Sequence, residues 1–484
     1  MSGSVLSIAP SAVRLALALA SLIPAEPRSA QAQPSARTRW APFFGEWIGV
    51  ADRRPDAGPP VSVRVRIEPD RDSARVLLTL PESRLIDLAI PSPYSDSTHV
   101  TLHGDSLRME FTPDIGLGIV SRLGIPRADE RIVLTLVRGG ERLAGSIRIT
   151  TYQAPVVLRR TAPGVDPHEP VVTFYSTHDS LRLAGKLVLP EGRGPFPAMI
   201  WVTGSDPDTR EAWQFEARTL AASGVASLLY DKRGVGASAG ASHDLASWDD
   251  LAGDVEGALR YLRSRPDRID STRLGLAGQS QGTWIIAKVA ARDPGVRFLV
   301  SISGSGISAA EQETYRTGAL MQRAGFDSVQ VARAVDFQRQ KFAVARTGLG
   351  WPHLDSLMQQ LRRDSVAWFP NYGTGAAIRS LAQLRLYGVL QFNYSPTRDL
   401  EQIQAPTLVL MGEGDVAFPP EIVVQRMRAA LERAGNRKVT TMILPNASHG
   451  MSELQTAGGQ AFRWAISPRF LQELTTWVPA TVKR

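Results

Sequence analysis

Residues 274–282, Leu-Gly-Leu-Ala-Gly-Gln-Ser-Gln-Gly, hold the pattern that decides the fold. An apolar stretch typical of a strand ends in Gly-x-Ser-x-Gly around Ser280, and the residues that follow, 283–290, are typical of a helix. A strand, a sharp turn and a helix in this order are the context of a nucleophile elbow, in which strained backbone exposes a serine hydroxyl above a sheet. The sequence therefore predicts Ser280 as a nucleophile.

Two polar residues follow buried strands later in the chain and complete a possible site. Asp415 comes after the predicted strand 407–411, and His449 comes after the predicted strand 440–444. A serine hydroxyl needs a histidine base, which in turn needs an orienting carboxylate. Because these loops leave the carboxyl ends of parallel strands, we expect the three side chains to meet at one sheet edge. Glu413 stays open as an alternative carboxylate.

The other histidines are weaker candidates for the base. We interpret them as lying in the N-terminal β region, at the opposite sheet edge or in solvated polar loops. They are His99, His103, His168, His178, His243 and His353.

Two backbone amides are the expected donors to the oxyanion of a tetrahedral intermediate. One is the amide of Gln281, directly after the nucleophile, and the other is the amide of Ser205, in the loop after the predicted strand 196–203. A second glycine-rich loop, 230–238, does not open a helix and so does not suit a phosphate. We expect Asp231 and Arg233 to fix this loop through charge-assisted hydrogen bonds; Arg233 binding a substrate carboxylate is the alternative.

The C-terminal part of the chain, 168–484, alternates strands with helices, which predicts a mainly parallel sheet. Ser247 is the expected N-cap of a helix over 248–263. The strand pattern stops between 304 and about 397, where the sequence is helical and rich in aromatic residues. We interpret this insert, at about 305–397, as a lid beside Ser280; a helical subdomain with its own core is the alternative, and both can be true of the same segment.

The N-terminal part, about 40–160, shows short segments of alternating polarity separated by turn residues, which predicts an antiparallel β-barrel or sandwich. Its first segment, 44–49, resembles the opening strand of lipocalin-like barrels, in which a tryptophan plugs one end. Trp47 as an ordinary core residue is the alternative. Residues 161–167 are rich in proline and glycine and are the predicted linker.

Residues 1–32 have the features of a signal peptide. Arg14 precedes a short apolar run, 15–23, and Ala-Gln-Ala at 30–32 matches a cleavage site. The run is too short to span a bilayer, and an uncleaved anchor is the alternative. We therefore expect an exported protein, periplasmic or secreted, without a stable membrane span in its mature form.

Composition narrows the possible partners. The 484 residues include no cysteine, which excludes disulfides, a thiolate nucleophile and thiolate metal sites. The net charge of +8 is spread along the chain without a basic block, so we expect no nucleic-acid partner. No cofactor or metal site is predicted.

Together these motifs resemble the α/β-hydrolase superfamily over about 168–484, and most of all exported serine aminopeptidase-like hydrolases and esterases with an N-terminal β domain. The resemblance implies a mostly parallel sheet with helices on both faces and a helical lid insert. It implies Ser280 as nucleophile, Asp415 as acid and His449 as base, with Gln281 and Ser205 at the oxyanion hole. The chain departs from the family at Thr203-Gly204, where His-Gly is common.

The expected function is therefore a serine hydrolase that cleaves carboxylic esters through an acyl-enzyme on Ser280. A peptidase or thioesterase of the same fold is the alternative, so the expected partner is a small ester, thioester or short peptide. From a different class, the chain could be a catalytically silent ligand-binding protein.

Overall fold

A computed structural model of the protein describes the chain over residues 36–51, 61–71, 73–81, 85–90, 99–111, 131–149, 152–161, 168–372, 378–387, 394–457 and 460–483. The predicted signal peptide and most of the predicted linker lie outside these ranges. Among the helices inside them, none is long and apolar enough to cross a membrane.

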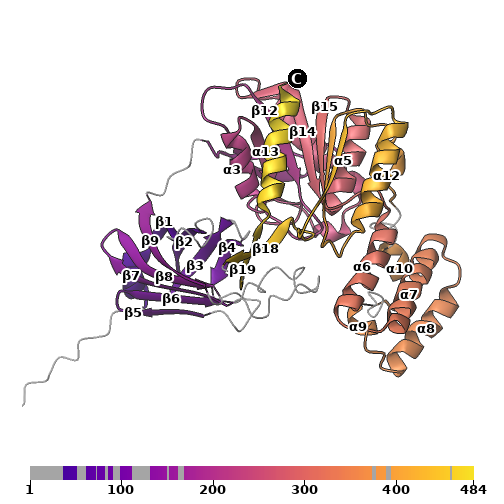
Figure 1. Ribbon diagram of the computed structural model, residues 1–484, viewed down its shortest axis with the longest axis horizontal. Coiled ribbons are helices and arrows are strands. Elements are labelled where there is room, and N and C mark those ends of the chain that lie inside the picture. The colour runs from indigo at the N-terminus through magenta and orange to yellow at the C-terminus, as the bar shows by residue number, and fades with distance from the viewer. Residues whose placement is uncertain are drawn as a thin grey trace, which may run out of the picture.

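The N-terminal sheet is antiparallel throughout and forms a nearly closed barrel, as Figure 1 shows. Its strand order is β4-β3-β2-β1-β9-β8-β7-β6-β5, so β4 and β5 are the two edge strands of the sheet. The sequence predicted these strands except β4. Their bounds are β1 Gly45–Ala51, β2 Val61–Asp70, β3 Ser73–Leu80, β4 Leu85–Ile90, β5 His99–His103, β6 Ser106–Phe111, β7 Ile132–Gly139, β8 Arg142–Ile149 and β9 Tyr152–Thr161.

Alternating burial along the barrel strands builds one apolar core. Trp47 of β1 lies fully buried in it, and its indole Nε1 donates to the Phe43 carbonyl at 2.8 Å. The guanidinium of Arg160, on the neighbouring β9, lies 4.4 Å from the centre of the Trp47 ring. Trp47 is therefore a core residue held by a cation–π contact.

The second sheet carries the α/β fold that the sequence predicted. Its order is β10-β11-β13-β12-β14-β15-β16-β17. The strands from β12 to β17 run parallel, and β10 and β11 form an antiparallel hairpin at one edge. Their bounds are β10 Val171–Tyr175, β11 Arg182–Val188, β12 Phe196–Val202, β13 Ala226–Tyr230, β14 Ile269–Gln279, β15 Val296–Ile302, β16 Thr407–Gly412 and β17 Val439–Leu444.

Helices cover both faces of this sheet (Figure 1). On one face α3 (Gln214–Ala222) and α13 (Pro468–Val482) share a core with the strands. On the other face α4 (Trp248–Arg263), α5 (Gln281–Arg292) and α12 (Pro420–Arg433) do so. The expected N-cap of α4 is confirmed, because the Ser247 hydroxyl accepts from the backbone of Asp250 in a capping box.

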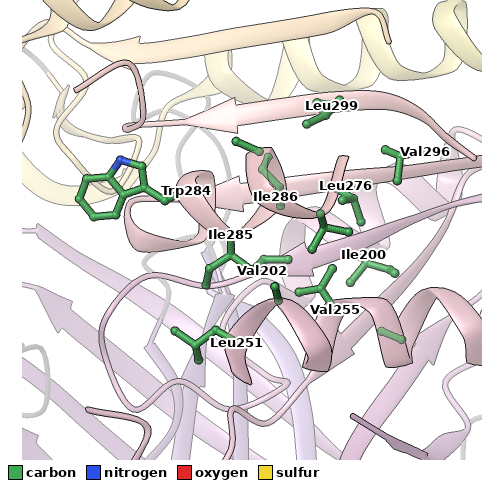
Figure 2. Packing of buried hydrophobic residues seen from close by; sticks show 14 of the residues in the cluster. Ile200, Val202, Leu251, Val255, Leu276, Trp284, Ile285, Ile286, Val296 and Leu299 are labelled. Atoms are coloured by element: carbon green, nitrogen blue, oxygen red, sulfur yellow. The ribbon is translucent and has the colours of Figure 1, made fainter. Parts of the chain in front are cut away.

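The core between β12, β14 and the helices α4 and α5 fixes the position of the elbow. Figure 2 shows Ile200, Leu276, Val255 and Ile286 among the side chains of this cluster. Burying each such side chain contributes roughly 1.5–3 kcal/mol. Because the strand before Ser280 and the helix after it are both anchored here, the turn between them has little freedom.

All the regular elements that the structure describes in the insert after β15 are helices. Its helices are α6 Ala309–Arg323, α7 Ser328–Thr347, α8 Trp351–Arg363, α9 Phe369–Tyr372, α10 Leu381–Tyr387 and α11 Thr397–Leu400. Residues of α7, α8 and α9, together with Met321 and Leu384, form a separate apolar cluster. The insert is thus a subdomain with its own core.

A short hairpin that the sequence did not predict follows the His449 loop. It consists of β18 (Ser452–Ala457) and β19 (Gln460–Ile466). The backbone of Ser448 donates to the Ser452 carbonyl at 2.8 Å, so the start of the hairpin braces the loop that carries His449.

Gly282 allows the elbow to pack closely on the sheet, and its replacement should disrupt that packing. A Cβ atom at this position would lie 2.1 Å from the Val202 carbonyl oxygen. We expect Gly282→Ala to destabilise the protein by about 1–3 kcal/mol or more. The measurement is thermal unfolding followed by near-UV circular dichroism. Gly139→Ala is the control, because a Cβ there meets open space; equal losses for both variants would contradict the prediction.

Candidate active site

Ser280 occupies a strained turn between β14 and α5. Its φ of +52° and ψ of −117° lie outside the regions that residues with a side chain normally adopt. The Ser280 amide donates to the Ile302 carbonyl at 3.0 Å, and its own carbonyl accepts from the Thr283 hydroxyl at 2.6 Å. These bonds hold the turn, and the residue stays partly exposed. The local structure is therefore that of the predicted elbow.

His449 and Asp415 form a buried pair at the same edge of the sheet. The imidazole Nδ1 lies 2.9 Å from Oδ2 and 3.1 Å from Oδ1 of the carboxylate. Asp415 follows β16 and His449 follows β17, and these two strands are parallel neighbours. The topology thus brings together two residues that are far apart in sequence.

The surroundings of Asp415 determine which nitrogen of His449 is basic. Its Oδ1 also accepts from the backbone amides of Ala417 and Phe418, at 2.8 and 3.0 Å. A carboxylate can only accept, so Nδ1 of His449 carries the proton and Nε2 keeps a lone pair. The Phe418 ring stacks on the imidazole, with centroids 5.8 Å apart and planes at 10°. His449 is therefore oriented as a base.

Glu413, the alternative carboxylate, points elsewhere. It is exposed, and its Oε2 accepts from the backbone amide of Asn446 at 3.1 Å. This bond ties the end of β16 to the His449 loop but leaves the imidazole to Asp415. The geometry thus favours Asp415 as the orienting carboxylate.

Ser280 and His449 are not hydrogen-bonded to each other within the described part of the chain. The Nε2 atom of His449 instead lies 3.3 Å from the side-chain nitrogen of Gln279, an amide that can donate to its lone pair. Catalytic hydrogen bonds are often long in unliganded sites and tighten when a substrate binds. Gln279 satisfies the imidazole in the resting site.

The loop after β12 lies directly against the elbow. Gly204 is buried there, and a Cβ added to it would lie 3.3 Å from the Cβ of Ser280 and 2.6 Å from Oε1 of Gln279. No larger residue fits without displacing these groups. The expected oxyanion donor, the amide of Ser205, follows immediately, so the structure brings the two halves of the predicted oxyanion hole to one place.

Two basic residues near this loop were missed as functional candidates. Lys232 is buried, and its Nζ donates to the Gly204 carbonyl and to Oε1 of Gln281, the latter at 3.3 Å. The His243 ring lies 2.9 Å from the Ser205 carbonyl through Nε2. His243 was expected to be solvated, and this was wrong: it is 7 % exposed and packs against the loop.

Burial changes the protonation of both groups. It lowers the pKa of Lys232 to about 8, against the opposing influence of Asp208 and Asp206. Burial, and after it the nearby charge of Lys232, lower the pKa of His243, which favours a neutral imidazole. The sequence could not predict the Lys232–Gly204 hydrogen bond, because it joins residues in two loops that are 28 positions apart.

Asp231 and Arg233 fix the 230–238 loop as expected. The Asp231 carboxylate accepts from the backbone amides of Arg210 and Ala237, each at 2.8 Å. The Arg233 guanidinium binds Asp254 of α4 at 2.9 and 2.6 Å. A further bond joins Arg233 to Asp179 at 3.0 Å. Arg233 is thus engaged by acidic residues of the protein, which argues against its binding a substrate carboxylate.

The first helix of the insert contacts the loop that carries Asp415. The Tyr315 hydroxyl of α6 lies 3.4 Å from the Asp415 carbonyl, and the Gln312 side chain donates to the Ala417 carbonyl at 3.1 Å. The insert therefore begins beside the candidate site.

No group of three His, Asp or Glu side chains that could hold a metal ion occurs in the described ranges. The functional groups that the structure brings together here are a serine, an imidazole–carboxylate pair and backbone amides. This set suits nucleophilic and general-base chemistry at a carbonyl group.

The defining pattern of the Alpha/beta hydrolase family matches residues 199–458. This range spans more than half of the chain and contains the elbow, the Asp415 loop and His449. The protein is therefore a member of the alpha/beta hydrolase family.

Curated relatives match parts of the same region. The 2,6-dihydropseudooxynicotine hydrolase of Paenarthrobacter nicotinovorans is 29% identical over 164 residues, 33% of this chain and 40% of that protein. Thiohydrolase aneE of Aspergillus aculeatus is 29% identical over 128 residues, 26% of this chain and 39% of that protein. The matched region spans less than half the length of these relatives. An esterase structure from Pyrococcus furiosus matches with a TM-score of 0.42 and 15% identity, covering 67% of this chain and 96% of that chain.

The choice between Asp415 and Glu413 can be tested without an activity assay. A proton shared between a buried imidazole and a carboxylate is protected from exchange and gives a far-downfield proton NMR signal. We expect wild type and Glu413→Gln to show this signal, and Asp415→Asn to lose it, because an amide at 415 no longer offers two acceptor oxygens. A signal retained in Asp415→Asn and lost in Glu413→Gln would reverse the assignment.

Proposed function

We propose that the protein is a serine hydrolase that cleaves carboxylic esters through an acyl-enzyme formed on Ser280. The observation that carries the proposal is the buried His449–Asp415 pair at the sheet edge that also carries the Ser280 elbow. A nucleophile, an oriented base and backbone donors at one edge are the set that acyl transfer needs.

The first half of the reaction forms the acyl-enzyme. His449 Nε2 takes the hydroxyl proton of Ser280 while the Ser280 oxygen attacks the ester carbonyl. The negative charge on the carbonyl oxygen is stabilised by the amides of Gln281 and Ser205. The intermediate collapses, the bond to the alcohol oxygen breaks, and His449 returns the proton to the leaving alcohol.

The second half releases the acid. Water replaces the alcohol and gives a proton to His449 Nε2 as its oxygen attacks the acyl carbonyl. The resulting intermediate expels the Ser280 oxygen, which takes the proton back from His449. Asp415 stabilises the imidazolium in both halves through its bond to Nδ1.

A thioester is the second candidate substrate, and one observation favours it. A relative that shares 29% identity with part of the chain is named a thiohydrolase. A short peptide is the remaining alternative within the same chemistry. The insert is proposed as the lid that selects among these substrates, because α6 contacts the Asp415 loop. Export of the enzyme stays a prediction from residues 1–32.

The proposal predicts that Ser280 is the residue labelled by a fluorophosphonate. We expect wild type to be labelled and to turn over short p-nitrophenyl esters, and Ser280→Ala to lose labelling and about 10³-fold or more of kcat. Intact-protein mass spectrometry and initial rates are the measurements. Ser303→Ala is the matched control, because Ser303 is a buried serine in the neighbouring loop with a strained φ of +51°.

Failure of wild type to react with either reagent would contradict the enzyme proposal and favour a ligand-binding protein. A panel of p-nitrophenyl esters, acyl thioesters and aminoacyl amides then ranks the substrate classes by kcat/KM. Amides as the best class would replace the ester proposal with a peptidase.

A further inference from the structure

We propose that Lys232 is a positioning residue that holds both halves of the oxyanion hole, and that its positive charge strengthens the donors. The inference rests on the proposed acyl-transfer function. It starts from the two oxygens that Nζ contacts, the carbonyl of Gly204 and Oε1 of Gln281. The Gly204 carbonyl belongs to the same peptide unit as the Ser205 N–H, and Ser205 and Gln281 are the two expected oxyanion donors.

The first contact orients a peptide plane. The carbonyl of Gly204 and the amide N–H of Ser205 belong to the same peptide unit, and in a trans peptide they point in opposite directions. By holding the Gly204 oxygen on one side, Lys232 directs the Ser205 N–H away from itself. Among the described residues, the Ser205 N–H donates to no group, so it is available to a substrate oxygen.

The position of the Gly204–Ser205 peptide also supports its role in the oxyanion hole. Gly204 passes so close to the elbow that its added Cβ would lie 3.3 Å from the Ser280 Cβ. A peptide fixed at this point stands beside the nucleophile. His243 holds the next carbonyl, that of Ser205, at 2.9 Å, so the peptide units on both sides of Ser205 are restrained.

The second contact ties the loop to the start of α5. Lys232 Nζ lies 3.3 Å from the side-chain oxygen of Gln281, whose backbone amide is the other expected donor. One ammonium group therefore bridges the β12 loop and the elbow. Small changes in donor position matter, because donors must reach the oxyanion at about 2.7–3.1 Å.

The burial of Lys232 argues for a role beyond loop packing. It is 4 % exposed, and burying an ammonium group is costly unless the group is hydrogen-bonded or paired with an opposite charge. A cation on the carbonyl oxygen of a peptide polarises the N–H of the same unit, and hydrogen bonds that involve a charged group are roughly twice as strong as neutral ones. The charge of Lys232 is thereby placed where it can strengthen the Ser205 N–H as a donor when negative charge develops during the reaction.

Titration of Lys232 makes the inference measurable. Its pKa of about 8 is set by burial, with Asp208 and Asp206 of the β12 loop, Asp244 of the neighbouring turn and Asp254 of α4 acting in the opposite direction. His243, from the same turn as Asp244, also faces it. Below pH 8 the ammonium is charged, and above pH 8 it loses its proton. The rate should therefore fall as the pH rises through about 8.

The experiment measures kcat and KM for a p-nitrophenyl ester from pH 6 to 9.5, with Ser280→Ala as the blank. We expect Lys232→Met to lower kcat about 10- to 100-fold and to leave KM within about twofold, less than the 10²- to 10³-fold loss seen when a donor is removed. Lys232→Gln keeps a donor but no charge, and it should fall between Met and wild type. Both variants should lack the alkaline decrease near pH 8.

A transition-state analogue separates positioning from general damage. A trifluoromethyl ketone forms a tetrahedral oxyanion on serine, so its inhibition constant should rise by the same factor as kcat/KM falls. Lys341→Met is the matched control, because burial lowers the pKa of Lys341 to about 8 as well, but on α7. It should leave kcat and the alkaline decrease unchanged.

The outcomes distinguish the two proposals. If wild type neither reacts with a fluorophosphonate nor turns over esters, the proposed function itself is wrong. An active wild type overturns the Lys232 inference if its rate stays level from pH 7 to 9.5, or if folded Lys232→Met keeps wild-type kcat or changes KM alone. Loss of the alkaline decrease in Lys341→Met would equally overturn it.

Discussion

The close approach of the elbow to β12 is the constraint on which the site depends. Gly282 permits this approach, because a Cβ there would lie 2.1 Å from the Val202 carbonyl oxygen. Gly278 permits the tight turn itself, because a Cβ there would lie 2.5 Å from the Gly282 carbonyl oxygen. Because the turn is this tight, α5 begins directly after Ser280, and the loop that leaves β12 crosses the start of that helix. This one packing contact therefore positions both the nucleophile and the two expected oxyanion donors.

Charge is distributed around this contact in two distinct ways. Asp231 and Arg233 are satisfied inside their own network of backbone amides and carboxylates, and they give the 230–238 loop a fixed shape. Lys232, between them in sequence, turns the other way, and both oxygens that accept from it belong to neutral groups. Asp231 and Arg233 hold the loop in place. The charge of Lys232 is therefore directed at the elbow and at the loop after β12.

The sequence predicted the parts of the molecule that local patterns encode. Residue periodicity gave the strand–helix alternation, and chain order selected Asp415 and His449, because a parallel sheet places such loops at one edge. It missed β4, β18 and β19, and it missed the burial of Lys232 and His243. Whether a lysine or histidine is buried depends on what packs over it, and in both cases the partner is the 204–205 peptide from another loop. The predicted signal peptide and most of the predicted linker lie outside the described residues and stay predictions.

In the structure, the candidate site and the segments that can vary around it are built from different parts of the fold. The insert leaves the sheet after β15, whose last residue, Ile302, accepts from the Ser280 amide, and the β18–β19 hairpin leaves just after His449. The insert and the hairpin therefore both follow segments that carry or contact candidate site residues. The strands beneath them share one core with the flanking helices. Changes in the insert can reshape the space above Ser280 without moving the serine, because the elbow is held from below by β12 and β15. We expect residues of the insert to select the acyl group, and residues at the edge of the sheet to carry out the chemistry.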